Sequence, residues 1–186
     1  MGAALLVIDM QNAYFEDPSL QGQRRELVEG CNRLMDLARS LGVPVFAVVT
    51  EHARDKSTWT LSMLEDSQGF AYPGTRQAEM LEDLETAGCT TVAKIRDSAF
   101  HGTDLAQRLR VLGAQRIVLC GVSAEDCIAR TGADAFAHDF AVAYARDAIG
   151  SIDPELGRQT LDKLATQYRQ EQLENSDLGE WMSRGS

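Results

Sequence analysis

Residues 116–127 read RIVLCGVSAEDC, and this stretch carries the strongest indication of both the fold and a reactive site. Its first five residues have the composition of a strand buried on both faces, and Gly121 ends that strand. An acidic pair then leads to Cys127, and residues 125–138 follow the pattern of a helix. We therefore expect Cys127 in the first turn of a helix at the carboxyl edge of a sheet, where unpaired N–H groups and the helix dipole favour an anion. A thiol in that position tends to have a lowered pKa and to act as a nucleophile.

Apolar runs of this kind alternate with helical patterns along the chain. Strands are predicted at residues 5–8, 44–49, 91–95, 116–120 and 140–145. Helices are predicted at residues 24–41, 77–87, 105–112 and 125–138, and from Asp153–Pro154 towards Tyr168. This alternation is typical of an α/β fold, and we expect a doubly wound, mainly parallel sheet with helices on both faces. The irregular stretch at residues 50–74 is long enough to be a functional loop.

The length, charge and cysteine content narrow the class of protein. The 186 residues are expected to form one domain, residues 1–186. A net charge of −10 argues against binding of nucleic acid or of an anionic membrane, and no apolar run approaches the roughly 20 residues of a membrane span. The N-terminus lacks the charged region and cleavage site of a signal peptide. The four cysteines form no CxxC pair, so we expect reduced thiols in a cytoplasmic protein.

Three reactive side chains, Asp9, Lys94 and Cys127, fall at the ends of three predicted strands. Ligands of open parallel sheets bind beyond the carboxyl ends of the strands, so these side chains are expected to meet there. Each has an ordinary explanation on its own, because Asp9 could cap a turn, Lys94 could reach into solvent and Cys127 could fill the core. Together they form a reactive group, since the acid can accept the thiol proton and the cation can stabilise both anions.

The segments around these residues resemble the motifs of the isochorismatase-like cysteine hydrolases. Leu6–Asn12 is similar to the opening of that family, Lys94–Phe100 to its lysine motif and Gly121–Cys127 to its nucleophile turn. The resemblance runs from about Ala3 to Ser151. It implies a doubly wound parallel sheet and a hydrolase that cleaves a C–N bond of a small amide, carbamoyl, ureide or imide substrate through a thioester intermediate.

The resemblance also implies roles for individual residues. Asp9 is expected to act as the base and later as the acid, Lys94 to orient and polarise, and Cys127 to attack the substrate. The peptide bond between Val122 and Ser123 is expected to be cis. The backbone N–H groups of Ser123 and Cys127 would then point at the developing oxyanion.

The substrate pocket is expected to include three further residues. Trp59 and Phe100 would lie near the strand edge, and Ala124 stands where many relatives have threonine. These positions and the loop at residues 50–74 are the least family-like parts, so they are expected to determine specificity.

The nicotinamidase branch of the family binds a metal through an Asp-x-His pair just after the second strand and through further histidines. Here that place reads Thr50-Glu51-His52-Ala53-Arg54. The chain has three histidines, His52, His101 and His138, which are far apart in sequence. We therefore expect neither a metal nor another cofactor.

Two other functions stay open. Hydrolysis of a vinyl ether, as in the isochorismate-cleaving branch, does not need the cysteine, and a non-catalytic small-molecule binder on the same fold would have no use for an intact triad. Nucleotide binding is set aside because the chain lacks both GxGxxG and GxxxxGK[ST]. The expected partner is thus a small-molecule substrate, and relatives suggest a homodimer or a homotetramer.

Overall fold

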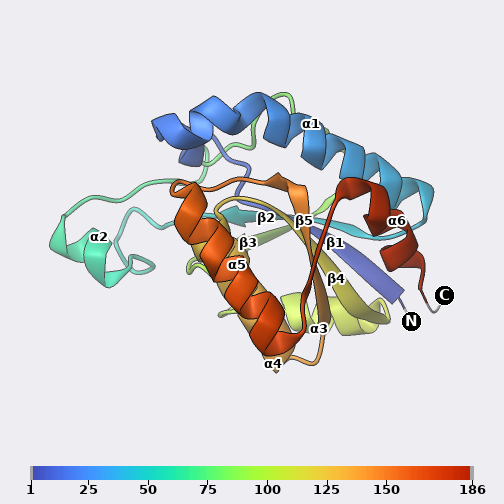
Figure 1. Cartoon of the computed structure of the whole chain (residues 1–186). Helices are drawn as coiled ribbons and strands as arrows, with labels where there is room; N and C mark the ends of the chain where they lie inside the picture. Colours follow the sequence, from blue (N-terminus) through green and yellow to red (C-terminus); the bar gives the residue numbers. More distant parts are fainter. Residues whose placement is uncertain (1, 185–186) are drawn as a thin grey trace.

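Six parallel strands form the central sheet of the protein, seen in a computed structural model that describes residues 2–184 (Figure 1). The strands are β1 (Gly2–Ile8), β2 (Val45–Thr50), β3 (Thr90–Lys94), β4 (Ala114–Gly121), β5 (Ala141–Ile149) and β6 (Glu171–Leu173). Their order is β3-β2-β1-β4-β5-β6, and every neighbouring pair is parallel. The chain winds outward from β1 in both directions, which confirms the predicted doubly wound α/β sheet and places the switch point between β1 and β4.

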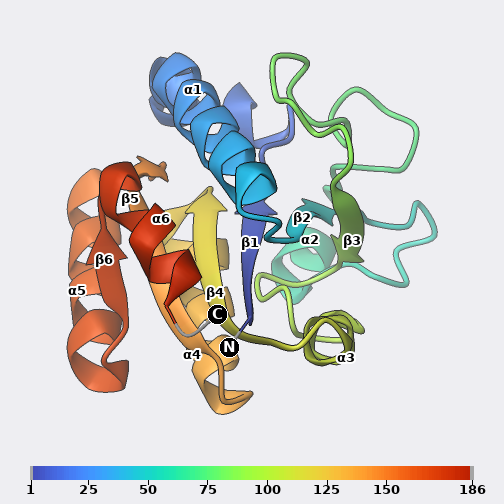
Figure 2. The same cartoon turned by 90° about the vertical axis from the view of Figure 1, so that its right-hand side faces the viewer.

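Helices cover both faces of this sheet (Figure 2). One face carries α1 (Pro18–Ser40) and α6 (Asn175–Ser183), and the other carries α3 (Leu105–Val111), α4 (Ala129–Ala137) and α5 (Pro154–Tyr168). The remaining helical turns are η1 (Tyr14–Glu16), α2 (Leu61–Glu65) and η2 (Ala124–Ile128). The loop that contains α2 projects from the rest of the molecule (Figure 1).

The apolar composition of β1 follows from its burial on both faces. Leu5 and Val7 pack in the cluster beneath α1 and α6, whereas Leu6 and Ile8 pack in the cluster formed with α3, α4 and α5. All four side chains are 0% exposed. A strand held from both sides fixes the position of the residue that follows it, and that residue is Asp9.

One predicted helix is wrong, because residues 77–87 form turns instead. The segment crosses the end of β1, where Gln11 and Met80 form an antiparallel bridge and the N–H of Leu81 donates to the carbonyl of Met10 at 2.9 Å. Leu81 is buried, so the apolar residues that suggested a helix do enter the core. Several backbone hydrogen bonds of this segment, however, go to the loop after β1, and those within the segment close isolated turns and not a continuous helix.

Other elements differ from prediction in extent. The helix expected over residues 125–138 is divided into η2 and α4, and the short α2 lies inside the stretch predicted to be irregular. The pair β6 and α6 was not predicted, although α6 places Trp181 and Met182 in the core. Within residues 2–184, no helix combines the length and the apolar character that crossing a membrane requires.

Candidate active site

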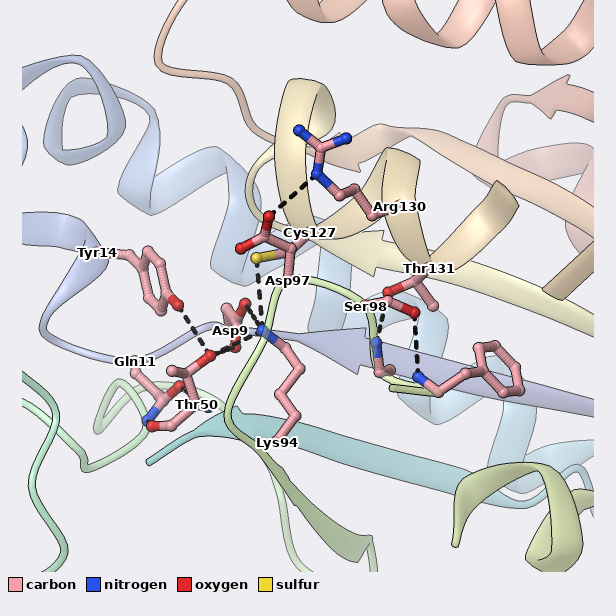
Figure 3. Close-up of polar contacts among 12 residues, drawn as sticks. Asp9, Gln11, Tyr14, Thr50, Lys94, Asp97, Ser98, Cys127, Arg130 and Thr131 are labelled. Carbon is pink, nitrogen blue, oxygen red and sulfur yellow. Dashed lines mark hydrogen bonds and ion pairs between the residues drawn. The ribbon is translucent and has the colours of Figure 1, made fainter. Parts of the chain in front are cut away.

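Four strands end at one edge of the sheet, and a polar side chain closes or follows each of them (Figure 3). Thr50 and Lys94 are the last residues of β2 and β3, Asp9 follows β1, and Cys127 lies in η2 after β4. Asp9 is 0% exposed, Lys94 1% and Cys127 5%. The structure therefore brings together the three reactive residues that stand at strand ends in the sequence, in a site shielded from solvent.

The ammonium group of Lys94 is the centre of this cluster. Its Nζ lies 2.8 Å from Asp9 Oδ2, and it donates to Cys127 Sγ at 3.4 Å and to Thr50 Oγ1 at 2.8 Å. Asp9 Oδ2 is buried, and its contact with Lys94 is an ion pair. One cation thus touches both the carboxylate and the thiol, and one carboxylate oxygen still lacks a hydrogen-bond donor among residues 2–184.

The turn that carries Cys127 begins at Gly121, where the backbone changes direction. Gly121 has a φ of +108°, and an added Cβ there would collide with the carbonyl of Ile8 in β1. The peptide bond between Val122 and Ser123 is cis, the conformation expected above. Only glycine fits this close approach of the two strand ends, and the approach brings η2 next to Asp9.

The turn itself is π-helical, whereas an α-helical turn was expected. The N–H groups of Asp126 and Ile128 both donate to the carbonyl of Ser123, at 3.2 and 3.1 Å. The N–H of Ser123 makes no hydrogen bond to another residue of the described part of the chain. A π-helical turn is frequent at functional sites, and a free N–H beside a thiol can donate to an anion formed there.

The electrostatics of the cluster hold the cysteine as a thiol at rest. Burial raises the pKa of the Cys127 thiol well above its ordinary value, and the Asp9 carboxylate raises it further, while Lys94 opposes them. The lowered thiol pKa expected from the helix start is therefore wrong, because desolvation outweighs the helix dipole. Burial lowers the pKa of Lys94, but the Asp9 carboxylate and the contact with Cys127 outweigh it and leave that pKa raised. Lys94 is thus an ammonium ion, and the thiol needs a base.

Three polar residues of this site were not singled out from the sequence. The hydroxyl of Thr50 accepts a hydrogen bond from Tyr14 Oη at 2.9 Å and donates to Asp9 Oδ1 at 2.9 Å. The side chain of Gln11 pairs with both backbone groups of Thr50, at 2.7 and 2.9 Å. The available signal was the position of Thr50 directly after a predicted buried strand and that of Gln11 within the first motif.

A cavity of about 360 Å³ reaches Lys94 from the side of the projecting loop. Aromatic rings line one part of it, since Phe70 lies 6.0 Å from Tyr14 and 5.2 Å from His52 between ring centroids. Burial lowers the pKa of His52, and its Nδ1 faces the carbonyl of Thr58 at 3.2 Å. The cavity therefore has an aromatic side and a charged side, which Lys94, Arg96 and Asp97 line.

A second hollow, of about 480 Å³, shares Arg96 and Asp97 with the first and extends to α4. Asp97 and Arg130 form an ion pair of 3.0 Å beside Cys127 (Figure 3). His101 lines this second hollow. A larger hollow of about 830 Å³ lies at the opposite edge of the sheet, where β4 and β5 begin, and it includes none of the residues named in this paragraph.

The three residues expected to line the pocket lie elsewhere. Trp59 Nε1 donates to the carbonyl of Ala53 at 2.9 Å, so the indole packs within its own loop. Phe100 stacks on Phe140 at 5.8 Å in the core, and Ala124 belongs to the same core cluster. The structure does not bring these three side chains into the cavity that reaches Lys94, and the rings of Tyr14, His52 and Phe70 line it instead.

The segment Thr50 to Arg54 does not fit a metal site. The hydroxyl of Thr50 is fully engaged with Tyr14, Lys94 and Asp9. Among residues 2–184, no group of three or more His, Cys, Asp or Glu side chains is placed to hold a metal ion.

Known proteins resemble this chain both in sequence and in structure. The model of the Isochorismatase domain matches residues 3–173. A probable inactive nicotinamidase of Arabidopsis thaliana is 33% identical over 162 residues, which cover 82% of this chain and 83% of the relative. Nicotinamidase 3 of the same plant is 30% identical over 168 residues, which cover 88% of this chain and 80% of the relative.

Solved structures share the whole architecture. An isochorismatase family protein from Desulfovibrio vulgaris superposes with a TM-score of 0.87 at 28% identity, over 98% of each chain. N-carbamoylsarcosine amidase from Thermoplasma acidophilum superposes with a TM-score of 0.80 at 25% identity, over 94% of this chain and 97% of that one. The central sheet and the helices that cover it are therefore shared with these two solved structures.

Proposed function

The chain belongs to the isochorismatase family of hydrolases, and on that premise we propose that it cleaves a C–N bond of a small amide, carbamoyl, ureide or imide substrate. Cys127 is the nucleophile, Asp9 the base and later the acid, and Lys94 the cation that serves both. The observation that carries this proposal is the position of Lys94 Nζ, 2.8 Å from Asp9 Oδ2 and 3.4 Å from Cys127 Sγ.

In the first half-reaction, Cys127 Sγ attacks the carbonyl carbon while its proton passes to Asp9. An S–C bond forms, and the electron pair of the C=O π bond moves to oxygen. The backbone N–H groups of Ser123 and Cys127 donate to that oxyanion. When it collapses, the C–N bond breaks, Asp9 returns the proton to the leaving nitrogen, and a thioester remains on Cys127.

In the second half-reaction, water replaces the amine. Asp9 takes a proton from water, the water oxygen attacks the thioester carbonyl, and the C–S bond breaks. The departing sulfur recovers the proton from Asp9, so the site returns to its starting state. The sum of both halves is the addition of water across a C–N bond.

The electrostatics of the site explain why Cys127 needs both Asp9 and Lys94. A thiol whose pKa is raised by burial does not ionise alone at neutral pH, so it needs a base in contact. Lys94 stabilises the negative charge as it moves between Asp9 and Cys127, because it touches both.

Names of relatives support the class of substrate. Nicotinamidase 3 and N-carbamoylsarcosine amidase both carry an amidase name, and both match most of this chain. Another relative is named a probable inactive nicotinamidase, so membership of the family alone does not establish turnover. Cleavage of a vinyl ether is the weaker candidate here, because it gives no role to the contact between Lys94 and Cys127.

Organisation and location are proposed on the same footing. The chain forms one domain that works without a metal or another cofactor, as a homodimer or homotetramer in the cytoplasm. Its four free cysteines support a reducing compartment. Light scattering coupled to size-exclusion chromatography measures the oligomeric state directly.

A panel of small amides, ureides, carbamoyl compounds and imides tests the function. Release of ammonia or amine is measured with purified protein, and vinyl ethers and simple esters serve as comparison substrates. The proposal predicts turnover within the C–N group and none with vinyl ethers. Turnover confined to vinyl ethers would replace it with the alternative reaction, and no turnover anywhere would favour a binding protein.

A further inference from the structure

The hydroxyl group of Thr50 has a single orientation available to it. A hydroxyl offers one proton and two lone pairs. Lys94 Nζ donates to Thr50 Oγ1 at 2.8 Å, and Tyr14 Oη donates to the same atom at 2.9 Å. Both lone pairs are therefore occupied, and the hydroxyl proton can go only to Asp9 Oδ1, which lies 2.9 Å away.

We propose that Thr50, held by Tyr14, is a positioning residue that determines which oxygen of Asp9 receives the proton of Cys127. The hydroxyl of Thr50 engages Oδ1 and fixes the plane of the carboxylate. Oδ2 is then the acceptor that remains, because it is buried, accepts no hydrogen bond from residues 2–184 and is held only by the ion pair with Lys94 Nζ at 2.8 Å. This inference rests on the proposed function, because it specifies the atom that acts as the base.

Tyr14 can serve as a permanent donor in this arrangement. Burial raises the pKa of the Tyr14 phenol well above its ordinary value, and the nearby Asp9 carboxylate raises it further. The phenol thus keeps its proton through the neutral range and continues to donate to Thr50. Without that donor, the hydroxyl of Thr50 could rotate away from Asp9, towards the place that Tyr14 Oη occupies.

The backbone of Thr50 is held as firmly as its side chain. The N–H of Thr50 donates to Gln11 Oε1 at 2.7 Å, and Gln11 Nε2 donates to the carbonyl of Thr50 at 2.9 Å. Gln11 Nε2 also donates to the carbonyl of Ala78 at 2.8 Å. The end of β2 is thereby tied to the loop after β1, the segment that carries both Asp9 and Tyr14. A positioning group needs such rigid support to be effective.

Alkylation of Cys127 tests the inference without an identified substrate. The probe is iodoacetamide, and the rate of modification of Cys127 is followed by peptide mass spectrometry from pH 5 to 10. The starting protein carries Cys89→Ser, because Cys89 is partly exposed whereas the other three cysteines are buried. The charged and titratable groups that face the Asp9–Cys127 pair are Lys94 of β3, Tyr14 of η1 and Asp97 of the loop after β3.

Thr50→Val, Thr50→Ser and Tyr14→Phe are compared in that background. Thr50→Val removes a hydrogen bond that favours the charged carboxylate, and the titration of the Asp9–Cys127 pair should change with it, so the midpoint of the rise in rate should move by about one pH unit. Thr50→Ser should restore the midpoint and bring the rate within about twofold of the starting protein. Tyr14→Phe should move the midpoint in the same direction by a smaller amount. Thr103→Val is the matched control, because its hydroxyl donates to the carbonyl of Ala99 and not to a residue of the cluster.

Each outcome decides the inference. A midpoint in Thr50→Val and in Tyr14→Phe that equals that of the starting protein overturns it, even if thermal denaturation shows lower stability, because Thr50 is then only structural. If Thr50→Val fails to fold, Tyr14→Phe and Thr50→Ser still decide. If Cys127 of the starting protein resists alkylation at every pH, the proposed nucleophile fails and the inference falls with it. If Cys127 is alkylated rapidly and the Thr50 variants leave its pH profile unchanged, the inference about Thr50 is refuted, whereas the proposed nucleophile is not.

Discussion

Lys94 Nζ lies 2.8 Å from Asp9 Oδ2, in an ion pair of which the two side chains are 1% and 0% exposed. A buried pair of this kind is costly to form and still more costly to break, because either partner alone would be an unpaired charge in the core. The same ammonium reaches Cys127 Sγ at 3.4 Å. Loss of either partner would therefore destabilise the fold, and the same ammonium takes part in the proposed chemistry.

Replacement of Lys94 should lower both the stability of the fold and the rate of turnover. Lys94→Met leaves the carboxylate of Asp9 buried without a partner, which typically costs about 3–5 kcal/mol of unfolding free energy. Turnover should fall to background, because the negative charge on Cys127 loses its cation. Chemical denaturation and the amide assay measure the two effects. The exposed Lys163 gives the control variant Lys163→Met, and a Lys94→Met protein as stable as this control would contradict the buried charge pair.

Replacement of Asp9 tests the proposed base. Asp9→Asn keeps the shape of the side chain but removes the group that accepts the proton of Cys127, and loss of a general base typically costs about 10²–10⁴-fold in rate. Residues that act as a unit are not additive. The double variant Asp9→Asn/Cys127→Ala should therefore be hardly slower than Cys127→Ala. If its loss of kcat/KM instead equalled the product of the two single losses, Asp9 and Cys127 would act independently, which would contradict the proposal.

Removal of metal should leave the reaction unchanged. The segment from Thr50 to Arg54 does not offer a set of metal ligands, since the hydroxyl of Thr50 is fully engaged within the cluster. Turnover is measured before and after exhaustive chelation, with elemental analysis of the protein as purified. A stoichiometric metal whose loss abolishes turnover and whose return restores it would overturn this assignment.

Stability should fall at alkaline pH because of the buried site. The pKa values of Cys127, Tyr14 and Lys94 are all raised in the folded protein. Above the ordinary thiol pKa of about 8.5, the unfolded chain loses protons that the folded chain keeps, so the unfolding free energy falls as pH rises. Each such group contributes up to about 1.4 kcal/mol per pH unit between its unfolded and folded pKa.

Denaturation between pH 8 and 10, with a reductant present, tests this linkage. Cys127→Ala should reduce the slope of unfolding free energy against pH. Cys120 contributes a similar slope of its own, because its pKa is also raised in the core, by the neighbouring Cys31 and by burial. The variant should therefore flatten the profile only in part. An unchanged slope in Cys127→Ala would mean that the pKa of this thiol is the same in the folded and the unfolded protein, which would contradict the prediction.

Much of the architecture could be predicted because β1, β2 and β4 are buried on both faces and show it in their apolar residues. The positions of Asp9, Lys94 and Cys127 at strand ends followed from that pattern, since parallel strands bring their carboxyl ends to one edge. The helix predicted at residues 77–87 failed for a tertiary reason. Its backbone bonds to the loop after β1, and no local periodicity reports such a partner.

Details of the site depended on more than one strand and could not be predicted from local patterns. Thr50 and Tyr14 meet only when the end of β2 and the loop after β1 are side by side. The thiol pKa depends on how much solvent the other elements exclude, which the helix-start position of Cys127 does not report. Among the aromatic residues of the loop, Phe70 faces the cavity and Trp59 does not, because the direction of a side chain in an irregular segment has no period.

Turnover by Cys127→Ala is the most direct test of the central claim, which is that Cys127 is the nucleophile of a hydrolase. The comparison variant is Cys120→Ala, since Cys120 is a fully buried thiol of β4 whose Sγ lies 3.6 Å from the carbonyl of Leu6 and away from the cluster. On any substrate that the panel identifies, Cys120→Ala should keep most of the wild-type kcat, whereas Cys127→Ala should show none above background while it keeps the wild-type circular dichroism spectrum. A folded Cys127→Ala protein that retains near wild-type kcat would contradict the account.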